Sequence, residues 1–106
     1  MRKITKKASL AFIEGRNFKQ GNTQVQKFFG DTTEFLLFEN MIALYSRRNK
    51  SLFVTTAGYP TVTTKERLNG ILDVFGLPRV YQKDYEWYFT DGVKFNKPRE
   101  FHLNRG

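Results

Sequence analysis

The sequence predicts an α+β domain in which two helices pack on a largely antiparallel sheet of about five to six strands. Three observations predict it: two stretches have apolar residues at helical spacing, several short β-prone runs are separated by turn residues, and the elements follow the order α-β-β-β-β-α-β-β. At 106 residues the chain suits one domain. We expect residues 1–92 to form that domain and residues 93–106 to add a basic C-terminal edge strand or tail.

The first helix is expected over residues 1–15, where apolar side chains recur on one face. They are Ile4, Ala8, Ala11 and Phe12. Lys3, Lys6 and Lys7 fall on the other faces. Gly15 ends the helix or loosens its last turn.

Strands are expected between the two helices. A turn-rich stretch at 17–22 precedes the first strand signal, in which Val25, Lys27 and Phe29 are separated by single residues. Two further β-prone runs, 34–38 and 41–45, are joined by a tight reversal at Glu39 and Asn40. A basic loop at 47–50 then leads to a fourth run at 52–55.

The second helix is the clearest local signal, because its apolar residues lie at i, i+3, i+4 and i+7. They are Leu68, Ile71, Leu72 and Phe75. Thr63 and Glu66 form a capping-box pattern, which predicts a start at Thr64. Gly76 and Pro78 predict an end near Phe75. Gly70 allows a close approach of this helix to the sheet.

A terminal hairpin is expected from the β-prone runs 79–83 and 85–90. Regular alternation places Tyr85, Trp87 and Phe89 on one side, which is expected to face the core. Val93 and Phe95 could add a short edge strand. The Lys-Pro-Arg sequence at 97–99 breaks pairing, so the last residues are expected to form a tail.

Composition and motifs argue against several classes of protein. The chain has no cysteine, which excludes disulfides and thiolate metal sites and suits a reducing compartment. No apolar run has the length of a membrane span. The single histidine, His102, lies in the expected tail, and the carboxylates are scattered without a metal-ligand or nucleophile spacing. We therefore expect no enzymatic activity, no metal and no cofactor.

The net charge of +8 is uneven, with +6 in residues 1–30, +3 in residues 93–106 and −1 in between. A basic surface of this size on a small domain favours a polyanionic partner, because binding to phosphates releases condensed counterions. The alternative is that these lysines are ordinary solvated side chains.

Three groups of residues are candidates for contact with such a partner. The first is the basic N-terminal helix. The second is the start of the second helix, around Thr63 to Arg67, which combines free backbone amides with cations, and the third is a set of exposed aromatic residues on the hairpin, which could stack on bases. The alternatives are that the threonines only cap the helix and that most aromatic residues belong to the core. The candidate binding residues are Lys3, Lys6, Lys7, Arg47, Arg48, Lys65, Arg67, Tyr88 and, as a second stacking residue, Tyr81.

Four segments resemble a family of small proteins from bacteriophages, plasmids and other mobile elements of bacteria. They are KKASLAFIEGRNFKQGNTQV, LFENMIAL, TTAGYPTVTTKERLNG and VYQKDYEWYFTDG, within residues 6–92. The block from Thr63 to Gly70 is the most specific part of the resemblance, which stops at Gly92. No established chemistry comes with the family, but it implies an accessory protein that acts in the cytoplasm of a bacterial host.

These observations lead to two hypotheses about function. The first is a non-enzymatic protein that binds DNA or RNA through its basic surface. The second is an inhibitor of a host antiviral defence complex, of the anti-CRISPR kind, that binds a host nucleoprotein. The sequence does not separate them, and it leaves the oligomeric state open.

Overall fold

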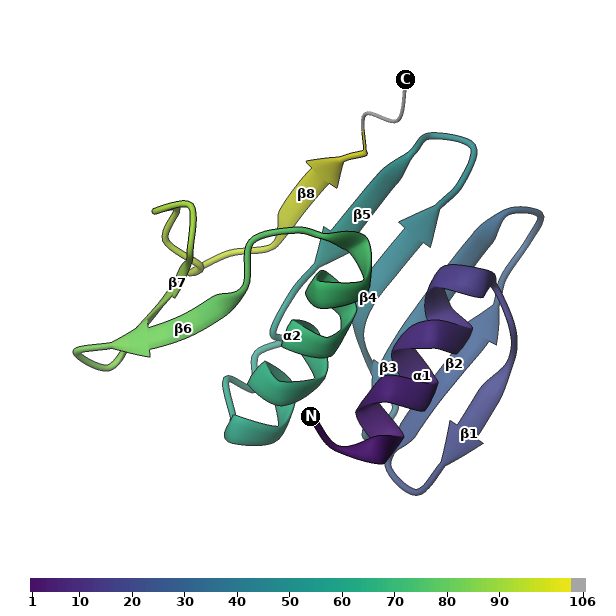
Figure 1. Ribbon diagram of the computed structural model, residues 1–106, viewed down its shortest axis with the longest axis horizontal. Helices are drawn as coiled ribbons and strands as arrows, with labels where there is room; N and C mark the ends of the chain where they lie inside the picture. Colours follow the sequence, from purple (N-terminus) through teal and green to yellow (C-terminus); the bar gives the residue numbers. More distant parts are fainter. Residues whose placement is uncertain (104–106) are drawn as a thin grey trace.

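The computed structural model describes residues 1–103 and has two helices and eight strands (Figure 1). The elements are α1 (Lys3–Glu14), β1 (Phe18–Gln20), β2 (Thr23–Lys27), β3 (Thr32–Leu37), β4 (Asn40–Ser46), β5 (Ser51–Val54), α2 (Val62–Phe75), β6 (Val80–Lys83), β7 (Glu86–Phe89) and β8 (Arg99–His102). No helix among these is long and apolar enough to cross a membrane.

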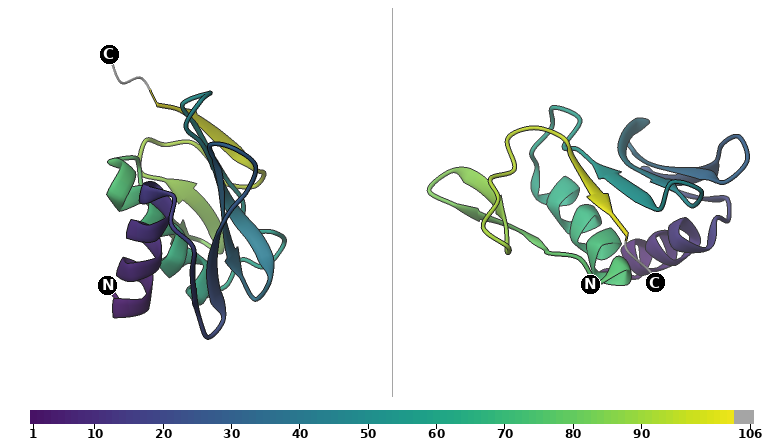
Figure 2. Two further views of the ribbon diagram at one scale, coloured as in Figure 1. Left: turned by 90° about the vertical axis from the view of Figure 1, so that its right-hand side faces the viewer. Right: turned by 90° about the horizontal axis from the view of Figure 1, so that it is seen from above.

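The strands form two antiparallel sheets. Six of them lie in the order β1-β2-β3-β4-β5-β8, while β6 and β7 form a separate hairpin. Both helices cover one side of the six-stranded sheet and leave the other side uncovered (Figure 2). The predicted α+β class, with two helices on an antiparallel sheet, is confirmed.

The core lies between the helices and the large sheet. Phe12 of α1 packs edge-on against Phe35 of β3, with ring centroids 5.7 Å apart, and against Phe75 of α2 at 6.0 Å. Tyr45 of β4 completes the cluster, 4.8 Å from Phe75. The apolar faces predicted for both helices therefore meet the sheet at a shared aromatic cluster.

Helix α2 ends as predicted but begins earlier. Gly76 adopts the left-handed conformation, and its N–H bonds to the carbonyls of Asp73 and Leu72. The N-cap is Thr61 rather than Thr63, because the Thr61 hydroxyl accepts a hydrogen bond from the Thr64 N–H at 3.1 Å. The capping-box prediction chose the wrong threonine among several candidates, and the helix gains two residues.

The C-terminal segment also differs from the prediction. Arg99–His102 pairs with β5 as an edge strand, so the break in pairing expected at 97–99 stops at Pro98, and Arg99 already pairs with Val54. Phe101 and Leu103 are buried. Arg99 packs on the rings of both Phe89 and Phe101 and forms an ion pair with Asp91. Of the two alternatives expected for residues 93–106, the edge strand is therefore the one formed, at Arg99–His102 rather than at Val93 and Phe95, while residues 104–106 lie outside the described part of the chain.

The two helices contact each other closely at Gly70. A Cβ atom at this position would overlap Thr5 Cγ2 of α1 and would lie 2.9 Å from Ser9 Oγ. Gly70 thus permits close helix–helix packing, rather than the helix–sheet approach that the sequence suggested. The adjacent Asn69 bonds through its amide group to both the N–H and the carbonyl of Val80, which ties α2 to the start of the hairpin.

We predict that Gly70→Ala destabilises the protein, although alanine is the better helix former by about 1 kcal/mol. Overpacking at a close contact costs about 1 to 3 kcal/mol, so the free energy of unfolding should fall. Urea denaturation measures it. Adding Thr5→Ser removes the overlapping methyl but keeps the hydroxyl, and should restore part of the loss. A more stable Gly70→Ala variant would show that the helices are free to move apart.

Candidate nucleic-acid interface

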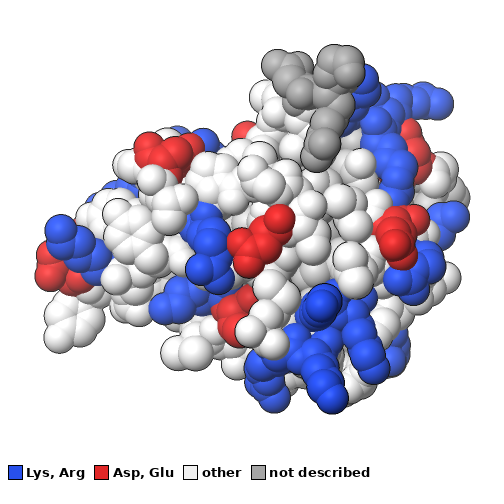
Figure 3. Space-filling view, viewed as in Figure 1, with Lys and Arg blue, Asp and Glu red and all other residues white. Residues whose placement is uncertain are grey.

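The outer side of α1 carries three lysines. Lys3, Lys6 and Lys7 are exposed and lie at i, i+3 and i+4, so they share one helical face, here called the α1 lysine face. The opposite face carries the buried Ala8 and Phe12. Lys and Arg side chains gather over the N-terminal half of α1 (Figure 3). The helix therefore presents a concentrated positive charge to solvent.

This charge lies where it disfavours the helix. The N-terminus of a helix is the positive end of its dipole, where acidic residues stabilise and cations destabilise. The first turn of α1 has no acidic residue, and its N-cap, Arg2, makes no side-chain capping bond. A carboxylate from α2 compensates in part, because Glu66 accepts a hydrogen bond from the Arg2 N–H at 3.3 Å.

Lys65 of α2 lies beside the start of α1. A hollow of about 630 Å³ separates the chain's first residue from the outer side of α2. Its lining residues are Met1, Val62, Lys65, Glu66, Asn69, Gly70, Asp73 and Arg79. Lys65 therefore adds to the positive charge at this end, while Asp73 is paired with Arg79 at 3.1 Å.

Arg67 is not on the surface, contrary to the expectation that it is exposed next to Lys65. It is only 2% exposed. Its Nε donates to the Thr23 hydroxyl at 3.1 Å and its Nη1 to the Thr5 hydroxyl at 2.9 Å, and it forms an ion pair with Glu66. Because a buried charge must be fully paired, Arg67 serves to join α1, α2 and β2.

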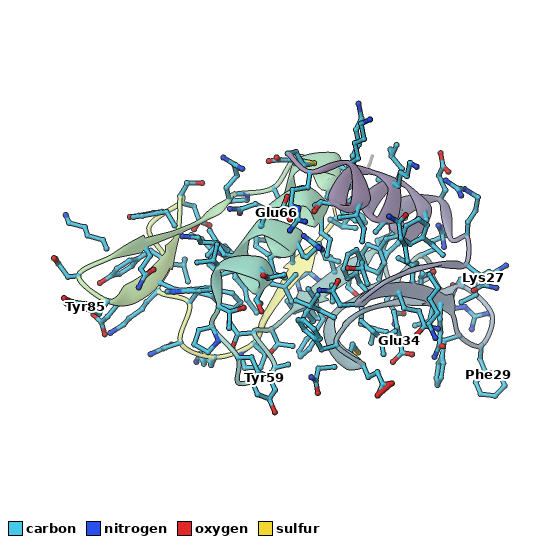
Figure 4. All side chains as sticks on the ribbon, turned by 90° about the horizontal axis from the view of Figure 1, so that it is seen from below. Lys27, Phe29, Glu34, Tyr59, Glu66 and Tyr85 are labelled. Carbon is cyan, nitrogen blue, oxygen red and sulfur yellow. The ribbon has the colours of Figure 1, made fainter. Side chains whose placement is uncertain are left out.

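Glu66 lies between the two helices (Figure 4). Burial opposes its ionisation, but hydrogen bonds from the Thr5 hydroxyl, the Arg2 N–H and the Arg67 guanidinium outweigh this effect and lower its pKa. The carboxylate is therefore ionised at neutral pH and neutralises Arg67 rather than the lysines.

The two arginines of the basic loop have different roles. Arg47 donates through Nη2 to the Ile13 carbonyl at 2.5 Å and packs on the Tyr45 ring and against Gly15. It therefore supplies a cation at the C-terminal end of α1, where the dipole favours one. Arg48 is exposed and lies 3.9 Å from Asp31. Both lie at the opposite end of α1 from Lys3.

Tyr88 lies on the β6–β7 hairpin, away from α1. Its ring stacks on that of its cross-strand partner Tyr81, with centroids 5.7 Å apart. Its hydroxyl lies 3.3 Å from a Glu86 carboxylate oxygen. Burial, followed by the Glu86 charge, raises the pKa of Tyr88. The two tyrosines form a small aromatic platform, but this platform is separate from the α1 lysine face.

The structure thus brings together only part of the predicted set. Lys3, Lys6, Lys7 and Lys65 gather at one end of the helical layer, Arg47 and Arg67 support the fold, and Arg48 and Tyr88 lie elsewhere. His102 is exposed on β8, and the described residues contain no group of three or more metal-ligating side chains.

Sequence reasoning missed one concave feature. A cleft of about 500 Å³ lies between the hairpin and the loop before α2, with Tyr85 and Trp87 in its wall. Tyr85 is 96% exposed at the hairpin tip rather than on the core side, so the expected alternation fails there. The sequence feature that could have revealed this position is the Lys83-Asp84 turn, because the turn extends to Tyr85 and removes that residue from the strand.

Comparison with family models places the chain in a known protein family. A model described as Kyanoviridae Gp96 protein matches residues 1–104. The chain belongs to this family of bacteriophage proteins. The family match includes β8, whereas the sequence resemblance stopped at Gly92. No curated protein and no solved structure matches the chain.

We predict that the protein loses stability as the pH falls below the ordinary carboxyl range of about 4. The folded state lowers the pKa of Glu66 and of Asp91, the latter through its bond to Arg99. Such groups stabilise the fold above their unfolded pKa, and this contribution is lost as pH falls through the folded pKa. Thermal unfolding measured from pH 7 to pH 3 checks this. Glu66→Gln should lower the melting temperature at pH 7 and flatten its pH dependence, and an unchanged pH profile would contradict the role given to Glu66.

Proposed function

We propose that this phage protein is a non-enzymatic accessory protein that binds nucleic acid through the α1 lysine face and Lys65. The observation that carries the proposal is the cluster of exposed lysines at the end of α1 where positive charge is unfavourable for the helix. Natural proteins keep such local conflicts mainly where function requires them. A phosphate backbone would relieve the repulsion and release counterions.

The pairing of the carboxylates supports the same proposal. Ion pairs in the described residues join Glu14, Asp31, Glu66, Asp73, Glu86 and Asp91 to arginines or to Lys94. None of these pairs involves a residue of the α1 lysine face, so its charge is not neutralised by the described chain. Contacts of this type are made to phosphates rather than to base edges, so we expect weak sequence preference and strong dependence on salt.

The match to a phage family supports a role inside the host cell. A phage protein acts in its host, and we propose the bacterial cytoplasm as the compartment in which it meets DNA or RNA. We propose no metal and no cofactor for this binding.

A second candidate function has its own support. Phe29, Glu34 and Tyr59 project from the side of the sheet that the helices leave uncovered (Figure 4). Phe29 and Phe38, at opposite ends of β3, are 86% and 63% exposed. Exposed aromatic residues at such a surface are typical of protein interfaces. This side would contact a host protein if the chain inhibits a defence complex of the anti-CRISPR kind.

The two candidates are separated by recovery of partners from infected cells. A host protein that stays bound after nuclease treatment, and that is lost on Phe29→Ala and Phe38→Ala substitution, supports the inhibitor. A partner that nuclease removes supports nucleic-acid binding.

We predict that replacing Lys3, Lys6 and Lys7 together by glutamine weakens binding to labelled DNA and RNA. Each lost phosphate contact should reduce the slope of log K against log salt by about 0.7 to 0.9. Fluorescence anisotropy at several salt concentrations measures both quantities. The melting temperature should stay the same or rise, because the change removes cations from the helix N-terminus.

The matched control replaces Lys19, Lys27 and Lys50 by glutamine. These lysines are also exposed, lie outside α1, and give the same change in net charge. An equal loss of affinity in both variants would mean that the protein attracts nucleic acid through its net charge alone, and an absence of binding by the parent at low salt would remove the proposal.

A further inference from the structure

The cleft beside the β6–β7 hairpin has the size and the side chains of a binding site. Its volume of about 500 Å³ lies within the range of small-ligand pockets. The side chains that line it include Tyr85, Glu86, Trp87, Lys94, Phe95 and Lys97. We call it the hairpin cleft. Its walls come from the hairpin, the loop before α2 and the segment before β8.

The hairpin tip holds Tyr85 in an unfavourable conformation. Asp84 and Tyr85 both have positive φ, 51° and 66°, as a two-residue type I′ turn requires. Asn-Gly is the preferred pair for this turn, and a bulky residue at positive φ is uncommon. Tyr85 is almost fully exposed. The turn therefore holds a large aromatic ring at the mouth of the cleft without burying it in the core.

Two further aromatic residues lie deeper in the cleft. Trp87 is 8% exposed and Phe95 is 5% exposed, with ring centroids 6.3 Å apart. Phe95 also packs at 4.6 Å from Phe89. These rings are fixed by the small core between the hairpin and β8. They provide an apolar floor, while Tyr85 provides an exposed aromatic face at the mouth.

Cations and hydrogen-bonding groups surround these rings. Lys97 is exposed at the rim, and Lys94 forms an ion pair with Glu86 at 2.6 Å. That bond is the main reason that the pKa of Glu86 is lowered, so both groups are charged at neutral pH. Asn96 and the hydroxyls of Thr55 and Thr56 add hydrogen-bonding groups.

We propose that the hairpin cleft receives an unpaired base of a single-stranded nucleic acid. The base would stack on Tyr85 and contact the edge of Trp87, and its phosphates would lie against Lys97 and Lys94. Aromatic residues beside cations recognise single strands in this way, because every base has a flat face but a duplex hides it. The inference rests on the proposed nucleic-acid binding and narrows it to single strands.

The position of the cleft suits a strand that also contacts α1. Helix α2 lies between α1 and the hairpin (Figure 1). The loop that lines the cleft, through Gly58 and Pro60, leads directly into α2, whose second turn carries Lys65. A single strand could therefore run from the α1 lysine face past Lys65 and around the start of α2 to the cleft.

Trp87 gives a direct readout, because it is the only tryptophan in the chain. Oligothymidylate and the matching duplex would be titrated at low salt, about 50 mM, while anisotropy and tryptophan emission are recorded together. We expect the single strand to quench the emission and the duplex to leave it nearly unchanged. Equal quenching by both, or binding of the single strand without quenching, would overturn the inference.

One variant is expected to increase affinity for the single strand, and a misfolded protein would not produce such an increase. Glu86→Gln removes a negative charge from the cleft and frees Lys94, so it should tighten binding of the single strand by roughly threefold. Lys97→Gln should weaken it by roughly fivefold. The matched control Lys83→Gln changes an exposed lysine of the same hairpin that does not line the cleft, and should change affinity by less than about twofold.

These outcomes also distinguish the two proposals. If anisotropy shows binding that depends on the α1 lysine face but not on Glu86 or Lys97, the cleft inference fails and the proposed function stands. If neither strand form binds the parent at low salt, the proposed function fails and the cleft inference fails with it.

Discussion

The structure depends on the close contact between α1 and α2. Gly70 lets the two helices approach, and the buried Arg67 then reaches the hydroxyls of Thr5 and Thr23 while Glu66 neutralises its charge. A buried guanidinium without these partners would cost several kcal/mol. The network therefore joins both helices to β2 and sets the rotation of α1 about its own axis. Because that rotation directs Thr5 inward, it also directs Lys3, Lys6 and Lys7 outward.

This arrangement explains why a destabilising charge pattern is tolerated. The lysines oppose the dipole of α1, but Glu66 from α2 reaches the free amide at its start and Arg47 from the loop after β4 binds a carbonyl near its end. The start of α1 is thus stabilised by α2, whereas its end is stabilised both by its own Gly15 cap and by Arg47. At the start of α1 a tertiary contact replaces the missing side-chain cap, so the outer face of the helix can carry positive charge without losing the helix.

Local patterns were enough to predict the fold class and the elements with strong periodicity. The apolar stripe of α2 and the glycines after each helix identified both helices. A C-terminal edge strand was expected as an alternative to a tail, but its position at Arg99–His102 was missed, because its stability comes from long-range contacts. Phe101 packs beside Phe89, and Leu103 N–H bonds to the Lys50 carbonyl at 2.7 Å. The candidate site was harder to predict from the sequence than the fold. Arg67 and Lys65 are close in the sequence and similar in charge, and only the packing of α1 on α2 decides that one is buried and the other is not.

The two sides of the molecule differ in the charge that they present to solvent. The helical side carries the α1 lysine face and Lys65. On the sheet, Leu44 pairs with Phe53 and Leu36 pairs with Met41, and these apolar side chains are only partly buried. A polyanion would be drawn to the helical side, since the electrostatic attraction follows the unpaired cations. The β6–β7 hairpin, with its stacked tyrosines and the hairpin cleft, lies on the far side of α2 from α1 (Figure 1). A flexible single strand can follow the curved path from the α1 lysine face around the start of α2 to the hairpin cleft. A duplex, with a persistence length of about 50 nm, cannot bend around one helix end.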